Sequence, residues 1–465
     1  MSRITILGAG LSGLVAGLLL ARDGHDVTLL ERDPEPVPDS PERAWEDWSR
    51  DGVVQFRQAH YLQPRGREVL EQELPDVLEQ LAAAGAVRFD VLSVMPPSIA
   101  DRGPRPGDER FTTLTARRPV LEQVLGRAAE SQPRLDVRRG VVATGLVTRN
   151  YDGIPHVTGV KTDRDEELDG DLVVDAMGRR SPLPGWLADI AGAPVYEESE
   201  DSGFVYYTRF FRASTAGMPQ YRSAPVTPIG SFSILILLSD NDTWSVTLHA
   251  SAGDRPLKRM REPDRWDAVM AACPLHAQWI DGEPISEVLP MGGIVDRYRR
   301  VVVDDQPPIT GVALLADAWA CTNPSLGRGI TLGLLHARHL RDVARCVHDD
   351  PREFAAAWDT ITEKHLTPWY RDTVMQDRAR LGEIEALRNG VAPPPPDPLR
   401  AALAVAAMYD PDLFRIFLEN RCCLTPLDDV LARPGIADRA LEGAREREVR
   451  PTPGPDRAQL LTLLS

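Results

Sequence analysis

The first 31 residues carry the clearest hydrophobic pattern in the chain. The apolar run Arg3–Leu7 predicts a short buried strand, Leu11–Arg22 predicts a helix, and Asp26–Glu31 predicts a second strand. These elements form a β-α-β unit, which is typical of a parallel sheet covered by helices.

The rest of the chain continues in alternating blocks. Pro34 to about Trp48 is rich in proline and acidic residues and predicts a loop. The predicted helices are Pro64–Ala84, Pro119–Ala129 and Gly329–Val347, followed by a helical region from Phe354 that a linker at Pro393–Pro396 interrupts. The predicted strands are Asp136–Val147, His156–Lys161, Asp171–Asp175, Gly203–Phe211, Ser231–Leu238, Thr243–Ala250 and Val312–Ala316.

Composition narrows the class of protein. The formal net charge of the 465 residues is −16, which argues against nucleic acid and anionic membrane surfaces as partners. No apolar run reaches the ~18 residues that a membrane span needs. The five cysteines show no metal-binding or redox spacing, so we expect a reduced, cytoplasmic protein without a metal. Cys422 and Cys423 fall on a predicted helix, where packing is the simpler role.

The segment Gly8-Ala9-Gly10-Leu11-Ser12-Gly13 lies between the first strand and the first helix. This is the dinucleotide-binding fingerprint: Gly8 permits the turn, Gly10 lets a diphosphate approach the backbone, and Gly13 lets the helix pack on the strand. The N–H groups of Leu11 and Ser12 would then face the phosphates. Glu31 ends the second strand, where a carboxylate accepts the ribose hydroxyls, and Arg32 follows it.

A second segment indicates which dinucleotide binds. Leu315-Ala316-Asp317-Ala318 precedes Asn323-Pro324-Ser325-Leu326-Gly327-Arg328-Gly329, which opens a helix. Asp317 can accept a hydrogen bond from a ribityl hydroxyl. Pro324, Gly327 and Gly329 allow the backbone to approach an isoalloxazine ring. We therefore expect one FAD.

With both motifs in place, the chain resembles the FAD-dependent aromatic hydroxylase superfamily of monooxygenases. Within it, the chain is most similar to bacterial natural-product enzymes, including flavin epoxidases, on the segments 52–60, 171–181 and 201–207. The late family motif matches at Asp317, Pro324, Gly327 and Gly329, but its leading glycine is Ala316 here.

The resemblance also assigns three further cofactor contacts. It implies that Arg57 reaches the FAD pyrophosphate, that Arg118 contacts the cofactor, and that the Val142 backbone contacts adenine. His60 is more simply a capping or packing residue. The middle motif of the family has Asp-Gly where this chain has Met177-Gly178. The electron source therefore stays open between NAD(P)H and a partner flavin reductase.

The resemblance and the patterns together predict an α/β fold: a Rossmann-type FAD-binding domain, a β-sheet substrate domain and a C-terminal helical region. The expected division is 1–193 for the first part of the FAD-binding domain, with 89–115 contributing to the substrate domain. The substrate domain then covers 194–290, the second part of the FAD-binding domain 291–350, and the helical region 351–465.

The expected activity is monooxygenation of an apolar secondary metabolite, by epoxidation or hydroxylation through a flavin C4a-(hydro)peroxide, as the resemblance implies. The catalytic residues stay unknown. The main alternative is a flavin-dependent reductase or dehydrogenase of a prenyl or polyene substrate. A flavin-dependent halogenase would need an early lysine, and no lysine precedes Lys161. An FAD-binding protein without turnover is a further alternative.

Overall fold

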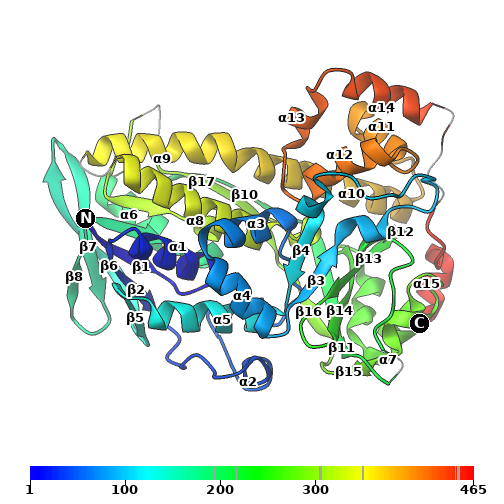
Figure 1. Ribbon diagram of the computed structural model, residues 1–465, viewed down its shortest axis with the longest axis horizontal. Helices are drawn as coiled ribbons and strands as arrows, with labels where there is room; N and C mark the ends of the chain where they lie inside the picture. Colours follow the sequence, from blue (N-terminus) through cyan, green and yellow to red (C-terminus); the bar gives the residue numbers. More distant parts are fainter. Residues whose placement is uncertain (193, 216, 303–305, 348–349, 446, 448–450) are drawn as a thin grey trace.

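A five-stranded parallel sheet forms the base of the N-terminal part of the molecule (Figure 1). The computed structural model describes residues 1–192, 194–215, 217–302, 306–347, 350–445, 447 and 451–465. The sheet order is β18-β9-β1-β2-β5, with β1 (Arg3–Leu7), β2 (Asp26–Glu31), β5 (Leu135–Arg139), β9 (Leu172–Asp175) and β18 (Val312–Leu314). The predicted α/β, Rossmann-type fold is confirmed.

Three helices pack around this sheet. Helix α1 (Leu11–Arg22) is buried along most of its length and packs on both α5 (Arg118–Ser131) and α8 (Gly329–Cys346). The remaining helices of this part are α2 (Pro41–Glu46), α3 (Pro64–Glu73), α4 (Pro75–Ala83) and α6 (Leu183–Ala191). Two small antiparallel sheets are attached: β3 (Val87–Asp90) with β4 (Thr112–Thr115), and β6 (Ala143–Tyr151), β7 (Ile154–Thr162) and β8 (Glu167–Asp169).

A second, antiparallel sheet stands beside the first (Figure 1). Its order is β12-β13-β14-β11-β15, and β16 also pairs with β11. The strands are β11 (Phe204–Arg212), β12 (Val226–Ile229), β13 (Phe232–Leu238), β14 (Thr243–Ser251), β15 (Glu283–Pro284) and β16 (Leu289–Met291). One face packs with α7 (Pro263–Ala271) around Trp244 and Trp266, and the other packs Phe204 and Tyr206 against Ile384.

A three-stranded sheet joins these parts. It consists of β10 (Tyr196–Asp201), β17 (Val295–Arg300) and β19 (Ala320–Cys321). Residues 196–201, which the sequence division gives to the substrate domain, therefore pair with strands of the later segment. The expected boundary residue 193 lies outside the described residues. The domain division remains a proposal.

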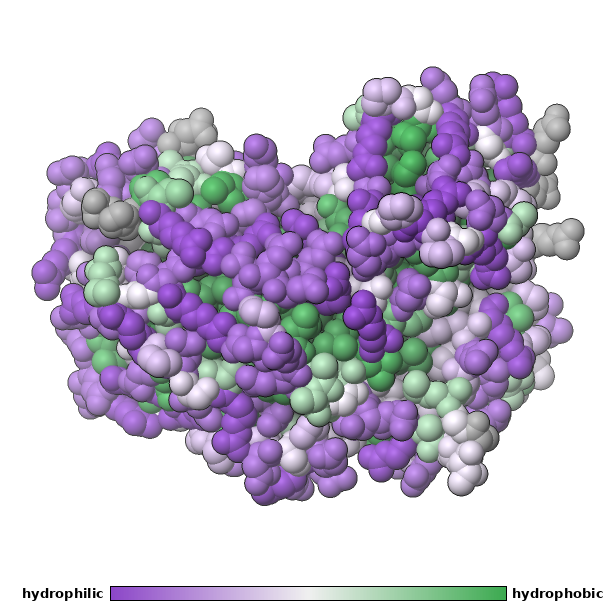
Figure 2. All heavy atoms as spheres, viewed as in Figure 1, coloured by the Kyte–Doolittle hydropathy of each residue, from purple (hydrophilic) through white to green (hydrophobic). Residues whose placement is uncertain are grey.

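The C-terminal region is helical. It contains α9 (Pro351–His365), α10 (Thr367–Asn389), α11 (Pro398–Ala407), α12 (Pro411–Arg421), α13 (Leu427–Leu431), α14 (Ile436–Ala444) and α15 (Arg457–Leu463). Helices α11 to α14 stand out as a separate lobe, whereas α15 returns to pack beside α7 (Figure 1). On the face shown in Figure 2, apolar side chains form small separated patches among hydrophilic ones.

Several local expectations were wrong for identifiable reasons. The predicted loop 34–48 contains α2, because the Ser40 side chain accepts the Arg43 N–H at 3.3 Å and Pro41 occupies the first turn. The predicted helix Pro64–Ala84 is two helices, because Leu74 leaves helical geometry before Pro75.

Three further boundaries differ. The predicted strand Asp136–Val147 is divided into β5 and β6, with Gly140 at a φ of +66° between them. The predicted strand Val312–Ala316 ends at Leu314. Cys422 and Cys423 follow α12 rather than lying within it, and Cys423 has a φ of +58°.

One buried ion pair joins the FAD-binding part to the antiparallel sheet. Arg117, directly before α5, donates to both carboxylate oxygens of Asp240, with the shortest contact from Nη2 at 2.6 Å. Asp240 lies in the turn between β13 and β14, and both side chains are almost fully buried. The pair fixes the second sheet against the start of α5.

Replacing Asp240 by alanine should lower the free energy of unfolding by about 3–5 kcal/mol, because an unpaired Arg117 would remain buried. Urea denaturation of the purified protein measures this. Asp47→Ala is the matched control, since its pair with Arg43 is exposed and should contribute less than about 1 kcal/mol. Equal effects of the two substitutions would contradict the prediction.

Candidate functional site

The three fingerprint glycines have different physical roles. Gly8 has a φ of +103°, and a Cβ there would lie 2.6 Å from the Ala176 carbonyl oxygen. A Cβ at Gly13 would lie 2.0 Å from the Gly8 carbonyl oxygen, so α1 packs directly on the turn. A Cβ at Gly10 would meet no atom of the described chain within 4 Å. Gly8 and Gly13 thus serve packing, and Gly10 leaves room for a ligand.

The start of α1 fits a diphosphate. Gly10 is the residue before the helix, and the first N–H groups of the helix, including those of Leu11 and Ser12, have no partner within it. These groups and the helix dipole favour an anion at the open space beyond Gly10. Helix α8 closes on the same turn, because a Cβ at Gly333 would lie 2.2 Å from Ser12 Oγ.

Glu31 lies where the fingerprint requires it, but its carboxylate already has partners. Its oxygens accept hydrogen bonds from the backbone N–H groups of Ala9 at 2.9 Å and Asp33 at 3.0 Å. Oε2 also forms an ion pair with Arg50. The residues therefore fit FAD at its diphosphate, whereas the ribose would share Glu31 with Arg50.

Arg118 belongs to a buried polar chain. Its Nε donates to Glu122 Oε1 at 2.6 Å, and its Nη1 donates to His60 Nε2 at 3.0 Å. His60 Nδ1 lies 2.9 Å from the Gln58 carbonyl oxygen, which only accepts, so the ring carries its proton on Nδ1. Burial and the Arg118 charge lower the pKa of His60 to about 3. His60 is therefore neutral and orients Arg118.

The late motif begins with a strained residue. Ala316 has a φ of +52°, a conformation that favours glycine and explains the family glycine at this position. Its N–H donates to Nδ1 of His336 on α8 at 3.0 Å, and His336 Nε2 lies 3.1 Å from Thr362 Oγ1. Burial holds the pKa of His336 well below its ordinary value. A neutral, fully buried histidine thus fixes the turn that carries Asp317.

Asp317 is suited to accept from a ligand. Among the described residues, no side chain or backbone group donates a hydrogen bond to its carboxylate, although it is only partly accessible. Burial raises its pKa, while Arg118 and Arg179 favour its charged form. A ribityl hydroxyl would give this carboxylate the donor that it lacks.

Side chains from distant segments hold the loop Asn323–Gly329. The Asn323 N–H donates to Asp296 at 2.7 Å, and Gln63 donates to the Leu326 carbonyl oxygen at 2.9 Å. Pro324 starts a short helical turn, and Gly327 has a φ of +60°. A Cβ at Gly329 would meet nothing of the described chain within 4 Å, so space is available where the ring is expected.

Arg328 attaches this loop to the C-terminal helices. It is 2 % exposed and donates to Asp372 of α10 at 2.7 Å and to Asn420 of α12 at 3.0 Å. Its guanidinium also lies over the Trp369 ring, 5.1 Å from the centroid. The loop is therefore bound to the C-terminal helices as well as to the sheet.

Three other predicted contacts lie apart from these groups. Arg32 is exposed and packs across Gly52. Arg57 donates to the carbonyl oxygens of Glu46 and Trp48, on its own segment. Val142 is exposed, and its N–H donates to the Asp163 carboxylate while its carbonyl oxygen accepts the Asp163 N–H. Their roles toward FAD stay predictions, with Val142 the least supported.

The middle motif packs beneath the fingerprint. Asp175 is fully buried, and its carboxylate accepts from the Met177 N–H at 3.0 Å and from Ser181 Oγ at 2.5 Å. Burial raises its pKa to about 6. Because Ala176 touches Gly8, the segment 175–181 supports the fingerprint turn.

Sequence reasoning missed several residues that the structure brings to the site. Glu122 follows Arg118 by four residues on one helix, and this spacing was a usable signal. Arg50 and His336 gave no such signal, because their partners lie far away in the sequence. The residues missed are Arg50, Gln63, Glu122, Asn323, Arg328 and His336.

In the part of the chain that the structure describes, no group of three or more His, Cys, Asp or Glu side chains could hold a metal ion. No helix within the described ranges has the length and hydropathy to cross a membrane.

Comparisons with known proteins agree with this geometry. Residues 1–187 match the family model described as the FAD binding domain. The chain is 27% identical over 467 residues to Protein Rv3254 of Mycobacterium tuberculosis, covering 94% of this chain and 92% of that protein.

Two solved structures show the same fold. PqsL of Pseudomonas aeruginosa, described as a probable FAD-dependent monooxygenase, aligns with a TM-score of 0.62 and 16% identity over 83% of this chain and 99% of its own. The flavin-dependent brominase Bmp2 aligns with a TM-score of 0.62 and 14% identity over 94% of this chain and 98% of its own.

These matches confirm the resemblance drawn from the sequence. Residues 1–187 match an FAD-binding domain, and the chain shares its fold with PqsL and Bmp2.

Gly10→Asp should fold normally and weaken FAD binding at least about 100-fold, roughly 3 kcal/mol, because its carboxylate would enter the space that favours an anion. Flavin fluorescence titration measures the affinity. Gly185→Asp is the control, since a Cβ there also meets nothing of the described chain within 4 Å but lies on α6. Normal FAD binding by Gly10→Asp would remove the fingerprint from the site.

One buried histidine near the site makes the free energy of unfolding depend on pH. His249 on β14 is 3 % exposed, its ring stacks on Tyr206 with centroids 5.0 Å apart, and neither ring nitrogen has a hydrogen-bond partner among the described residues. Tyr206 in turn donates to Asn323 at 2.7 Å. Burial, and then the charge of Arg380, lower the pKa of His249 to about 3.

An unfolded chain protonates this histidine below about pH 6.5, whereas the folded chain does not until much lower pH. His249 therefore lowers the free energy of unfolding by about 2 kcal/mol between pH 7.5 and pH 5. His249→Phe keeps an aromatic ring. Between pH 7.5 and pH 5, its free energy of unfolding should fall by about 2 kcal/mol less than that of the parent protein. Denaturant titrations at both pH values measure the difference, and parallel pH profiles would refute it.

Proposed function

We propose that this chain is an FAD-dependent monooxygenase that transfers one oxygen atom from O2 to a largely apolar small molecule. The observation that carries the proposal is the position of the Asn323–Gly329 loop. The chain that leads into it carries Asp317, and helix α8, which follows it, packs against Ser12 at the start of α1. On the other side, Gly327 lies against Tyr61, at the edge of a buried aromatic region.

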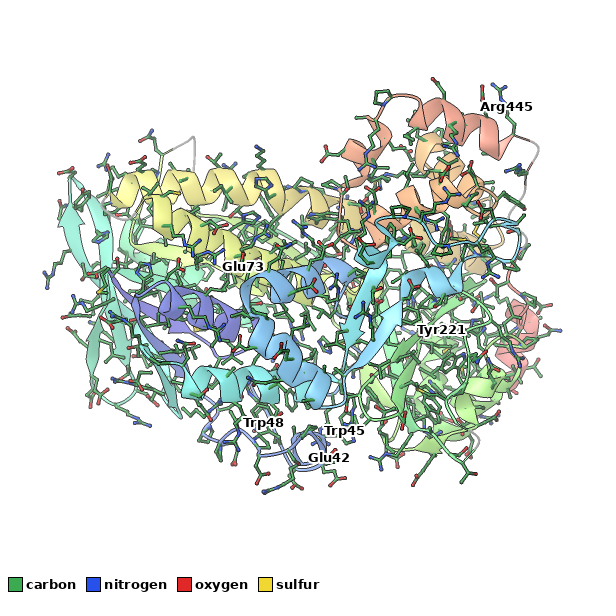
Figure 3. The ribbon with its side chains drawn as sticks, in the orientation of Figure 1. Glu42, Trp45, Trp48, Glu73, Tyr221 and Arg445 are labelled. Atoms are coloured by element: carbon green, nitrogen blue, oxygen red, sulfur yellow. The ribbon has the colours of Figure 1, made fainter. Side chains whose placement is uncertain are left out.

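Tyr61 is the contact between the loop and this aromatic region. A Cβ at Gly327 would lie 3.2 Å from the Tyr61 Cβ. Tyr61 packs against a buried cluster contributed by β3, the segment between β3 and β4, and the helices α11 and α12. The members of this aromatic cluster are Phe89, Val91, Met95, Ile99, Phe111, Ala407, Phe414, Leu418 and Cys422, with Tyr221 and Phe417 at its edge. Figure 3 labels Tyr221 beside the second sheet.

Such surroundings suit an apolar substrate. Bound FAD, once reduced, supplies the electrons that activate O2. The chain's own side chains then bind and orient the substrate and exclude water from the ring. On α12, beside the aromatic cluster, Arg415 forms an ion pair with Asp108 at 2.7 Å, and the Arg421 guanidinium lies over the Phe417 ring, 5.1 Å from its centroid.

The finer parts of the proposal rest on the sequence and on the family resemblance. They are epoxidation or hydroxylation of a secondary metabolite in natural-product biosynthesis, and a cytoplasmic location. The reductant is NAD(P)H or a partner flavin reductase, because Met177 replaces the acidic residue of the aromatic hydroxylases. The contacts assigned to Arg32, Arg57, Arg118 and Val142 belong to this proposal too.

A reductase or dehydrogenase of a prenyl or polyene substrate is the second candidate. The same apolar surroundings would suit such a substrate, and the fold is shared by enzymes with other reactions, including a brominase. A halogenase reaction is disfavoured because no lysine precedes Lys161.

The deciding experiment supplies ¹⁸O2 to the FAD-loaded protein with a reductant and candidate polyene or aromatic substrates. We expect one ¹⁸O atom in the product, measured by mass spectrometry, and no product under nitrogen. Unlabelled product, or equal turnover under nitrogen, would replace the monooxygenase proposal by the reductase or dehydrogenase.

A further inference from the structure

Arg50 is the most heavily engaged side chain near the fingerprint. It is 4 % exposed and forms ion pairs with Glu31, with Asp33 at 3.1 Å and with Glu122 at 2.5 Å. Its Nη1 also donates to the Ala9 carbonyl oxygen at 3.0 Å. The Arg50 guanidinium thus contacts the fingerprint, the carboxylate of Glu31 and helix α5.

The contact between Arg50 and Glu31 bears directly on how a ribose could bind. Glu31 is the acid that the fingerprint assigns to a ribose, and Ala9 lies inside the fingerprint itself. A guanidinium that touches both lies on the adenosine side of the site. The side chain and a ribose would therefore compete for the same carboxylate.

The other two ion pairs limit what Arg50 can do. If the arginine left altogether, three buried carboxylates would share only Arg118, which already pairs with Glu122. Buried carboxylates without a partner are costly. Arg50 is therefore expected to keep Asp33 and Glu122. Because its guanidinium is planar and rigid, the contact with Glu31 is then broken by the Glu31 carboxylate turning away from Nη2.

The segment that carries Arg50 is held in place at a second point. Trp45, on α2, packs on Phe210 of the second sheet with ring centroids 4.8 Å apart. The Arg117 guanidinium lies over the same ring at 4.7 Å and that of Arg57 at 5.5 Å. Figure 3 labels Trp45 and Trp48 on this segment, below α5.

We propose that residues 34–58 form a shutter over the adenosine side of the FAD site, in which Arg50 occupies Glu31 and Trp45 is the latch. FAD binding then exchanges the Arg50–Glu31 contact for a ribose–Glu31 contact after Trp45 has released Phe210. This inference rests on FAD being the ligand, as proposed above, and it adds a conformational step to binding.

The first test is the rate of FAD association with FAD-free protein, followed by the quenching of flavin fluorescence in a stopped-flow instrument. Opening before binding predicts a rate that reaches a plateau as the FAD concentration rises. Trp45→Ala should raise this plateau at least fivefold. Trp186→Ala, which removes a partly buried tryptophan from α6, should leave it unchanged.

The second test asks whether a ribose replaces Arg50 at Glu31 or whether Arg50 merely lies beside the bound FAD. Arg50→Lys keeps the charge but is too short to reach Glu31 together with Asp33 and Glu122. Exchange predicts that FAD binds at least threefold more tightly and that the melting temperature falls more for the FAD-free than for the FAD-bound protein. Arg457→Lys, in the partly buried pair with Asp254, is the matched control and should leave FAD affinity unchanged.

Three results would overturn the shutter. They are an association rate that stays linear in FAD concentration, an unchanged plateau in Trp45→Ala, and weaker FAD binding by Arg50→Lys. Failure of every variant and of the parent protein to bind FAD would instead overturn the FAD assignment, and the shutter with it.

Discussion

The site depends on backbone contacts that only glycine allows at the carboxyl ends of β1 and β9. Gly8 lies so close to the Ala176 carbonyl oxygen, and Gly13 so close to that of Gly8, that any Cβ would force the segments apart. Helix α8 approaches the same turn through Gly333 and Ser12. Because three segments meet there with only the small side chains of Ser12 and Ala176 between them, the start of α1 is held rigidly toward the space beyond Gly10.

Local signals in the sequence were sufficient for this part of the molecule. The β-α-β unit was predicted with its observed bounds, because its hydrophobic pattern and its glycines lie within a few turns of chain. The breaks at Leu74 and Gly140 were missed, since one apolar pattern continued across each of them. The helix α2 was missed because its proline and acidic residues are equally typical of a loop and of a first helical turn.

The candidate site was predictable only where it follows a motif. Asp317, Pro324, Gly327 and Gly329 lie near one another because all four belong to the short stretch of chain between β18 and the start of α8. The partners that hold them come from elsewhere: His336 reaches back 20 residues to Ala316, and Arg50 reaches Glu122 across 72. Pairing over such distances is decided by tertiary packing, which no local pattern records.

The C-terminal helices contact the candidate site through long-range contacts of the same kind. Arg328 stands between Gly327 and Gly329 in the Asn323–Gly329 loop, and its guanidinium is shared between Asp372 of α10 and Asn420 of α12. Helix α12 also contributes Phe414 and Leu418 to the aromatic cluster that Tyr61 joins to Gly327. A movement of α12 would therefore disturb the loop through Arg328 and the apolar region through Tyr61 at the same time. Helix α12 therefore contacts both the Asn323–Gly329 loop and the aromatic cluster.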